Sequence, residues 1–216
     1  MTQNAEDLLE ILTGQPVIPV VAVDSAADAV KLARALAAGG LPAIEITLRT
    51  DAAIDAIKAV SQEVPEAICG AGTILTTDQF DDAEEAGAKF IVSPGATIDL
   101  LDHAAGSVVP LLPGAATPSE LMSMLEEGYE VLKFFPAEQL GGVAYLKALA
   151  PVFQSIRFCP TGGVSPANVQ QYLTLPNVVC VGGSWVAPKD MVAAGRFEEI
   201  TALAREASTL RAQIHA

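Results

Sequence analysis

The segment VLKFFPAE (131–138) places Lys133 between two apolar residues and two phenylalanines. An ammonium group at the end of a buried strand is costly to desolvate, and burial favours the neutral amine of a lysine. The neutral amine is the nucleophile that forms an imine with a carbonyl substrate. Lysine is nevertheless rarely buried, so an exposed lysine at a strand end is the competing interpretation.

A second candidate group lies in IEITLRT (44–50), where Glu45, Thr47 and Arg49 are spaced two residues apart. Alternate residues of a strand point to one face, so the three side chains are expected at one site. A carboxyl group in an apolar strand suits general acid or base chemistry, and the planar guanidinium of Arg49 suits a carboxylate. A structural ion pair of Glu45 with an arginine or a lysine is the alternative.

Two glycine-rich turns are candidates for binding an anion. They comprise Thr161, Gly162 and Gly163, and Gly182, Gly183 and Ser184. Backbone N–H groups can approach a phosphate closely where no side chain intervenes, although tight turns alone also explain glycine pairs. The segment GAGTIL (70–75) lacks the third glycine of a dinucleotide-binding motif, and no P-loop sequence occurs.

Short β-branched runs alternate with helical segments along the whole chain. Eight such runs are expected as strands, at residues 17–23, 43–48, 67–73, 89–95, 108–114, 129–136, 156–163 and 177–183. This order predicts an α/β fold, a (β/α)8 TIM barrel over residues 1–216 as one domain, with an extra N-terminal helix at its bottom. A doubly wound open sheet is the alternative. In a barrel, the candidate residues above follow the carboxyl ends of strands, where catalytic groups lie.

Capping residues indicate where two of the helices begin. Thr117 is followed by Pro118 and then by Glu120, which is the spacing of a capping box with proline at the first helical position. Thr77 or Asp78 is expected to cap the helix that follows residues 67–73.

Composition excludes several classes of function. The chain is 51% hydrophobic with a mean hydropathy of +0.40, which is typical of a packed globular protein. Its net charge of −14 argues against nucleic acid or an anionic membrane as a partner. No apolar run is long enough to span a bilayer, and the acidic N-terminus does not resemble a signal peptide. We therefore expect a cytoplasmic protein.

Neither metal binding nor cysteine chemistry is expected. The two histidines, His103 and His215, belong to no ligand motif, so the sequence predicts no metal. His103 is expected on a helix, at the surface or a helix end. Cys69, Cys159 and Cys180 lie in apolar runs and are expected to be buried, reduced thiols.

The candidate motifs together resemble one family. IEITLRT, GAGTILT, FIVSPG, PGAATPSE, LKFFPAE, CPTGGVSP and VGGSW occur in the order found in the 2-keto-3-deoxy-6-phosphogluconate (KDPG) aldolases, also called 4-hydroxy-2-oxoglutarate aldolases. The match runs from about Pro16 to Trp185, and LKFFPAE is highly specific to that family. No motif departs from the family pattern.

The resemblance implies a class I aldolase of the Entner–Doudoroff pathway, usually a homotrimeric (β/α)8 barrel. Such an enzyme cleaves KDPG reversibly to pyruvate and D-glyceraldehyde 3-phosphate without a cofactor, and often 4-hydroxy-2-oxoglutarate to pyruvate and glyoxylate. Lys133 is then similar to the Schiff-base lysine and Glu45 to the general acid/base. The resemblance places Arg49, Thr73, Pro94 and Phe135 on the pyruvate side, and Thr161, Gly162, Gly163, Gly182, Gly183 and Ser184 on the phosphate and hydroxyl side. Thr161 is similar to the residue that KDPG-specific members carry, so the resemblance implies KDPG rather than its galactonate epimer as the substrate.

Two other functions remain as alternatives. One is a phosphosugar isomerase or epimerase, with Lys133 as an electrostatic group and Glu45 as the base. The other is a non-catalytic phosphosugar-binding barrel, in which Lys133→Ala would leave binding almost unchanged.

Overall fold

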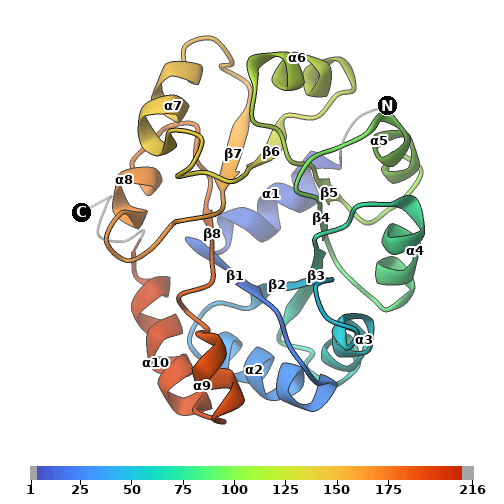
Figure 1. Ribbon diagram of the computed structural model, residues 1–216, viewed down its shortest axis with the longest axis vertical. Helices are drawn as coiled ribbons and strands as arrows, with labels where there is room; N and C mark the ends of the chain where they lie inside the picture. Colours follow the sequence, from blue (N-terminus) through green and yellow to red (C-terminus); the bar gives the residue numbers. More distant parts are fainter. Residues whose placement is uncertain (1–3, 211–216) are drawn as a thin grey trace.

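The computed structural model describes residues 4–210, which form an α/β fold with a curled parallel sheet inside and helices outside (Figure 1). The strands are β1 (Val17–Val21), β2 (Ala43–Thr47), β3 (Ile68–Gly72), β4 (Ile91–Val92), β5 (Leu111–Leu112), β6 (Val131–Phe134), β7 (Arg157–Pro160) and β8 (Val181–Gly183). The helices are α1 (Ala5–Thr13), α2 (Ala26–Ala38), α3 (Ala53–Glu63), α4 (Thr77–Glu85), α5 (Ile98–Ala104), α6 (Pro118–Glu126), α7 (Gly142–Leu149), α8 (Val169–Leu173), α9 (Lys189–Ala193) and α10 (Phe197–Ser208).

All paired strands run parallel. Six of them pair in the order β5-β4-β3-β2-β1-β8, and β6 pairs with β7. Isolated parallel bridges join Gly114 to Lys133 beyond β5, and Thr161 to Gly182 beyond β7. Parallel neighbours require a crossover connection, which the intervening helices supply. The carboxyl ends of the strands therefore lie on one side of the molecule.

The alternation of side chains along the strands sorts apolar residues from polar ones on the concave side of the sheet. One apolar cluster contains Ile18, Ala43, Val92, Leu112, Val131 and Cys159, one from each of six strands. Side chains two positions further on face the same way. Glu45 follows Ala43 at this spacing, and Lys133 follows Val131. Within β2 and β6, the charged residue therefore lies nearer the carboxyl end of the strand than the apolar residue of the cluster.

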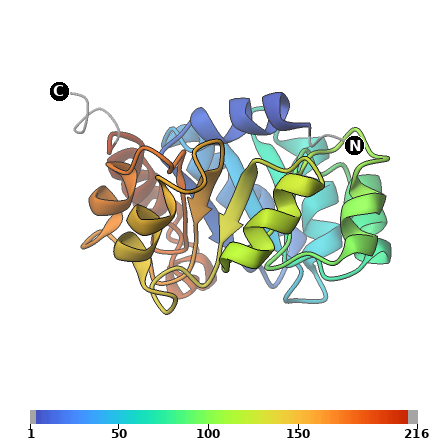
Figure 2. The same ribbon diagram turned by 90° about the horizontal axis from the view of Figure 1, so that it is seen from above.

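Helix α1 packs against this apolar cluster. Leu8 and Leu12 are fully buried and belong to the cluster, while Glu6, Asp7 and Glu10 on the same helix are not buried. Figure 2 shows α1 lying across one end of the strands, on the side away from the tip of β6. The helix thus covers apolar side chains of the strands at the end of the molecule away from the tip of β6.

Each expected strand is present, and every one is shorter than the run that predicted it, three of them markedly. The runs at 89–95, 108–114 and 177–183 contain strands of only two or three residues, β4, β5 and β8. Pro94 follows β4 closely, and Pro110 and Pro113 flank β5. Proline has no N–H to donate to a ladder, which explains why pairing stops beside it.

One of the two predicted helix caps is confirmed and the other is wrong by one residue. Thr117 and Glu120 form the reciprocal hydrogen bonds of a capping box, and Pro118 begins α6. Helix α4, however, is capped by Thr76, whose side chain accepts the N–H of Gln79. Two adjacent threonines offer the same chemistry, so sequence alone does not distinguish them. The side chain of Gln79 also accepts a hydrogen bond from the N–H of Leu75, which holds the segment just before α4.

The three cysteines are buried, as expected, and form no disulfide within residues 4–210. Burial raises the pKa of the Cys69 thiol to about 12. Only about one part in ten thousand of this thiol is ionised near pH 8, and the thiolate is the reactive form. We expect thiol reagents to label Cys69 slowly in the native protein and rapidly in denaturant, measured by mass spectrometry. Fast native labelling of Cys69 would contradict its burial.

The raised pKa of Cys69 also makes the free energy of unfolding depend on pH. The folded protein favours the neutral thiol, so this contribution is complete at neutral pH. It is lost only as the pH rises through the folded-state pKa of about 12.

Within residues 4–210, no helix is long and apolar enough to cross a membrane.

Candidate active site

Lys133 and Glu45 form a buried ion pair across the concave side of the sheet. Lys133 Nζ lies 3.1 Å from Glu45 Oε1, and the two residues are 5% and 3% exposed. Lys133 comes from β6 and Glu45 from β2, so the fold joins residues that are 88 positions apart. Removing one partner of such a pair leaves the other charge buried and unpaired. Because Lys133 is almost fully buried, the competing interpretation of an exposed lysine is wrong.

Gly72, at the end of β3, provides the room that the side chain of Glu45 occupies. In the parallel register, Gly72 is opposite Thr47, which lies two positions beyond Glu45 on β2. A Cβ atom at position 72 would lie 2.1 Å from Glu45 Oε1 and 2.5 Å from its Cγ. No side chain fits there unless Glu45 moves. The sequence around Gly72 does not indicate this close approach.

Substituting Gly72 by alanine is expected to displace Glu45 from Lys133. Because Glu45 is held between strands, we expect kcat to fall by at least about tenfold, since small misplacements of reacting groups are costly. Steady-state kinetics checks this result. Gly95→Ala is the matched control, because a Cβ there would meet no atom within 4 Å. Equal activity of the two variants would contradict the role of Gly72.

Lys133 also contacts the ring of Phe135 and is held by backbone hydrogen bonds. Lys133 Nζ lies 5.5 Å from the centre of the Phe135 ring, over its face, and Phe135 is 38% exposed. An ammonium group is attracted to an aromatic face at this distance. Lys133 N donates to Pro113 O, and Ala115 N donates to Lys133 O, which fixes the backbone on the β5 side.

Arg49 lies just beyond β2 and is held by its neighbour in the IEITLRT motif. Arg49 Nε donates to Thr47 Oγ1 at 2.9 Å, and Thr47 Oγ1 in turn donates to Val21 O at 2.9 Å. The guanidinium is thereby oriented by β1 and β2 together. Glu45 and Thr47 share a strand face as predicted, whereas Arg49 has left the ladder and makes no recorded contact with Glu45 or Lys133 within residues 4–210.

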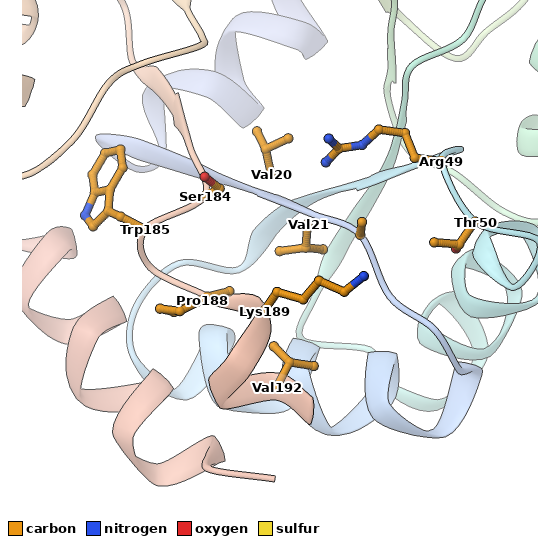
Figure 3. A pocket seen from close by; sticks show the side chains of 11 residues that line it. Val20, Val21, Arg49, Thr50, Ser184, Trp185, Pro188, Lys189 and Val192 are labelled. Carbon is orange, nitrogen blue, oxygen red and sulfur yellow. The ribbon is translucent and has the colours of Figure 1, made fainter. Parts of the chain in front are cut away.

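Arg49 and Ser184 line a cavity of about 550 Å³ beyond the ends of β1, β2 and β8 (Figure 3). Its other charged lining residue is Lys189, which comes from α9. No acidic residue lines the cavity, although the chain carries a net charge of −14. Lys189 Nζ lies 3.5 Å from Asp24 Oδ2, and both side chains are exposed. The cavity is therefore suited to anions; Lys133 and Glu45 are not among its lining residues.

Lys189 is a candidate anion-binding residue that no sequence motif indicates. It follows the VGGSW motif by four residues and carries no pattern of its own, because a lysine at a helix start is usually a solvated surface residue. Only the cavity distinguishes it from other exposed lysines.

Thr73 follows β3 with an unusual backbone conformation. Its φ of +64° makes it the one residue other than glycine with positive φ among residues 4–210. A β-branched residue is strained in this region, and such strain concentrates at functional sites. Pro94 lies two positions beyond the end of β4, and its carbonyl oxygen would be 2.2 Å from a Cβ on Gly114. No contact of Thr73 or Pro94 with Lys133 is recorded within the described part of the chain.

The two glycine-rich turns lie side by side. The backbone of Thr161 is bridged to Gly182, and a Cβ at position 182 would lie 2.2 Å from Thr161 Oγ1. Gly162 and Gly163 have φ values of +99° and +78°, which favour glycine. For the N–H groups of these two glycines, no acceptor is recorded among residues 4–210. They remain available to an anion.

His103 and the other possible metal ligands are dispersed. His103 Nε2 lies 2.6 Å from Asp81 Oδ1 on the surface, between α5 and α4, as expected for a helix-end histidine. Within residues 4–210, no three His, Cys, Asp or Glu side chains are grouped so that they could hold a metal ion.

The arrangement thus combines a buried amine, a carboxylate in contact with it, and glycine N–H groups and cationic side chains suited to an anion. The sequence also matches the family model described as KDPG and KHG aldolase over residues 8–203. The chain belongs to the KDPG/KHG aldolase family. The resemblance seen in the motifs is confirmed, and the protein is an aldolase, a carbon–carbon lyase.

Named members of the KDPG/KHG aldolase family are similar over almost the whole chain. The KHG/KDPG aldolase of Escherichia coli (strain K12) is 53% identical, over 91% of this chain and 92% of the relative. The KDPG aldolase of Legionella pneumophila, solved with pyruvate captured as a covalent carbinolamine, has a TM-score of 0.91 and 45% identity, over 93% of this chain and 97% of that one. The KDPG aldolase of Zymomonas mobilis ZM4, solved with 3-phosphoglycerate, has a TM-score of 0.89 and 47% identity, over 95% and 96% of the two chains.

Proposed function

We propose that this chain cleaves KDPG reversibly to pyruvate and D-glyceraldehyde 3-phosphate through a Schiff base on Lys133. The observation that carries the proposal is the 3.1 Å contact between the buried Lys133 amine and Glu45. A neutral lysine attacks carbonyl groups, and the adjacent carboxylate can receive its proton. The relative from Legionella pneumophila forms a covalent carbinolamine with pyruvate, which is the intermediate that such an attack produces.

The proposed chemistry uses Glu45 at each proton transfer. Lys133 Nζ adds to the C2 carbonyl, and loss of water gives a protonated imine. The C3–C4 bond then breaks, its electrons enter the imine, and the proton of the C4 hydroxyl passes to Glu45. Glyceraldehyde 3-phosphate leaves, and Glu45 returns the proton to C3 of the enamine. Hydrolysis of the remaining imine frees pyruvate and restores the lysine.

The two ends of the substrate are assigned to different groups of residues. We place the pyruvate portion near Phe135, with Arg49 and Thr73 toward its carboxylate and carbonyl and Pro94 beside them. We place the phosphate and distal hydroxyl groups at Thr161, Gly162, Gly163, Gly182, Gly183 and Ser184. The available N–H groups of Gly162 and Gly163 support this assignment, as does the Zymomonas mobilis relative, which was solved with a phosphorylated three-carbon acid.

The fold proposed for residues 1–216 is one (β/α)8 barrel closed by β6 and β7, with α1 covering its bottom. The isolated bridges beyond β5 and β7 support closure, because they join the two-stranded sheet to both edges of the six-stranded one. The burial of Leu8 and Leu12 among residues of the strands supports the position of α1.

We propose that the protein is a cytoplasmic homotrimer. Large apolar side chains that are exposed on the single chain support an assembly, and they include Leu75, Ile98, Met122 and Leu140. Light scattering is expected to give a mass about three times the 22.3 kDa of one chain. A monomeric mass at micromolar concentration would contradict the trimer.

The substrate is tested by comparing three donors in an assay coupled to lactate dehydrogenase, which reports pyruvate. KDPG is expected to give the highest kcat/KM, its galactonate epimer a lower value, and 4-hydroxy-2-oxoglutarate measurable turnover. The Escherichia coli relative carries both activities in its name. Absence of pyruvate from all three donors would contradict the proposed function.

A further inference from the structure

The loop after β6 braces the glycine turn after β7. Ala137 N donates to Thr161 O at 2.8 Å, and Glu138 N donates to Gly162 O at 3.1 Å. The stem of Glu138 also lies against Gly163, because a Cβ at that glycine would be 2.6 Å from both Cβ and Cγ of Glu138. A carboxylate is therefore attached directly beside the N–H groups assigned to phosphate.

Tyr172 binds the end of this carboxylate. Tyr172 belongs to α8 and is fully buried, and its hydroxyl donates to Glu138 Oε1. Gly142 closes the contact from another side, since a Cβ there would be 2.9 Å from the Tyr172 hydroxyl and 3.0 Å from Glu138 Oε1. Burial, with the hydrogen bond and charge of Glu138, raises the pKa of Tyr172 well above its usual value, so the phenol remains a donor at neutral pH.

A carboxylate next to a phosphate site is unfavourable unless its position is fixed. Two negative charges a few ångströms apart repel each other, and the repulsion grows as they approach. The hydrogen bond from Tyr172 directs the charged oxygen of Glu138 toward α8. The remainder of the glutamate side chain then serves as a wall that supports the turn.

We propose that Tyr172 and Glu138 are positioning residues for substrate phosphate: the tyrosine hydroxyl holds the glutamate against Gly163 and keeps its charge away from the bound dianion. The inference rests on the proposed function of the Gly162–Gly163 turn as the phosphate site. It assigns these two residues no contact with the reacting carbon atoms.

The test compares a phosphorylated substrate, KDPG, with an unphosphorylated one, 4-hydroxy-2-oxoglutarate. Tyr172→Phe is expected to raise KM for KDPG on the order of tenfold, the usual scale for losing a hydrogen bond to a charged group. Its kcat should change by less than about twofold, and KM for 4-hydroxy-2-oxoglutarate should not change, because the reacting groups are untouched. Inhibition by inorganic phosphate should weaken in parallel with the rise in KM for KDPG.

Variants of the exposed Glu138 keep the test valid even if Tyr172→Phe folds poorly. Glu138→Asp shortens the side chain, loses the tyrosine contact and keeps the charge, so it should reproduce the selective rise in KM. Glu138→Gln keeps an acceptor for Tyr172 without the charge and should show no rise. The double variant Tyr172→Phe/Glu138→Gln should recover most of the loss. An equal rise for both substrates, or no rise in Glu138→Asp, would overturn the proposal.

Failure of this inference and failure of the proposed function give different results. If phosphate does not inhibit the wild-type enzyme and KDPG is not preferred over 4-hydroxy-2-oxoglutarate, the phosphate assignment of the turn is wrong. If the wild type shows both properties but Tyr172→Phe and Glu138→Asp affect the two substrates equally, only the positioning role is wrong.

Discussion

Replacing Lys133 by alanine is expected to lower kcat for aldol cleavage by about four orders of magnitude or more, because it removes the amine on which the proposed imine forms. Lys133→Arg should be equally inactive, since guanidinium stays protonated and is not a nucleophile. The coupled pyruvate assay measures both. Lys147→Ala makes the same change on the exposed surface of α7 and serves as the control, with activity close to wild type.

Loss of fold must be separated from loss of chemistry in this experiment. Lys133→Ala leaves Glu45 buried without its partner, and breaking a buried pair in this way typically costs about 3–5 kcal/mol. The double variant Lys133→Ala/Glu45→Gln removes the unpaired buried charge. It should recover part of the lost free energy of unfolding, measured with denaturant. It should remain inactive. Substantial turnover by either variant would show that Lys133 is not the nucleophile.

Glu45→Gln is expected to lower kcat by about 10²–10⁴-fold, the usual contribution of a general acid/base. The amide can still contact Lys133 Nζ but cannot carry a proton between C4 and C3. Exchange of the pyruvate methyl protons with deuterated water, followed by NMR, isolates this step because it needs only the enamine. We expect the exchange rate to fall in step with kcat.

Glu63→Gln, at the exposed end of α3, is the matched control for that substitution and should exchange at the wild-type rate. A Glu45→Gln variant with full methyl exchange but slow cleavage would show that another group protonates the enamine. Normal values for both would contradict the role of Glu45.

The strand pattern allowed much of the site to be predicted from the sequence. Period-two alternation placed Glu45 on the same face as Thr47, and the order of the strands brought Lys133 to the same ends. The motif match then identified the family, which the comparisons confirm. These predictions succeeded because they depend on local periodicity and on residues that are rare in apolar runs.

Features that depend on register or on distant contacts could not be predicted in this way. The space that Gly72 leaves for Glu45 follows from which residues are opposite each other on β2 and β3. The contact between Tyr172 and Glu138 spans 34 positions, and Tyr172 has no distinctive local pattern. The shortness of β4 and β5 follows from prolines whose effect on the ladder depends on their position in it.

Trapping with sodium borohydride tests the central claim most directly. The protein is incubated with pyruvate, reduced, digested and mapped by mass spectrometry. We expect one reduced pyruvate adduct per chain, on the peptide that contains Lys133, and none in Lys133→Ala. An adduct on a different lysine, or full aldolase activity with no trapped adduct, would contradict imine formation at Lys133.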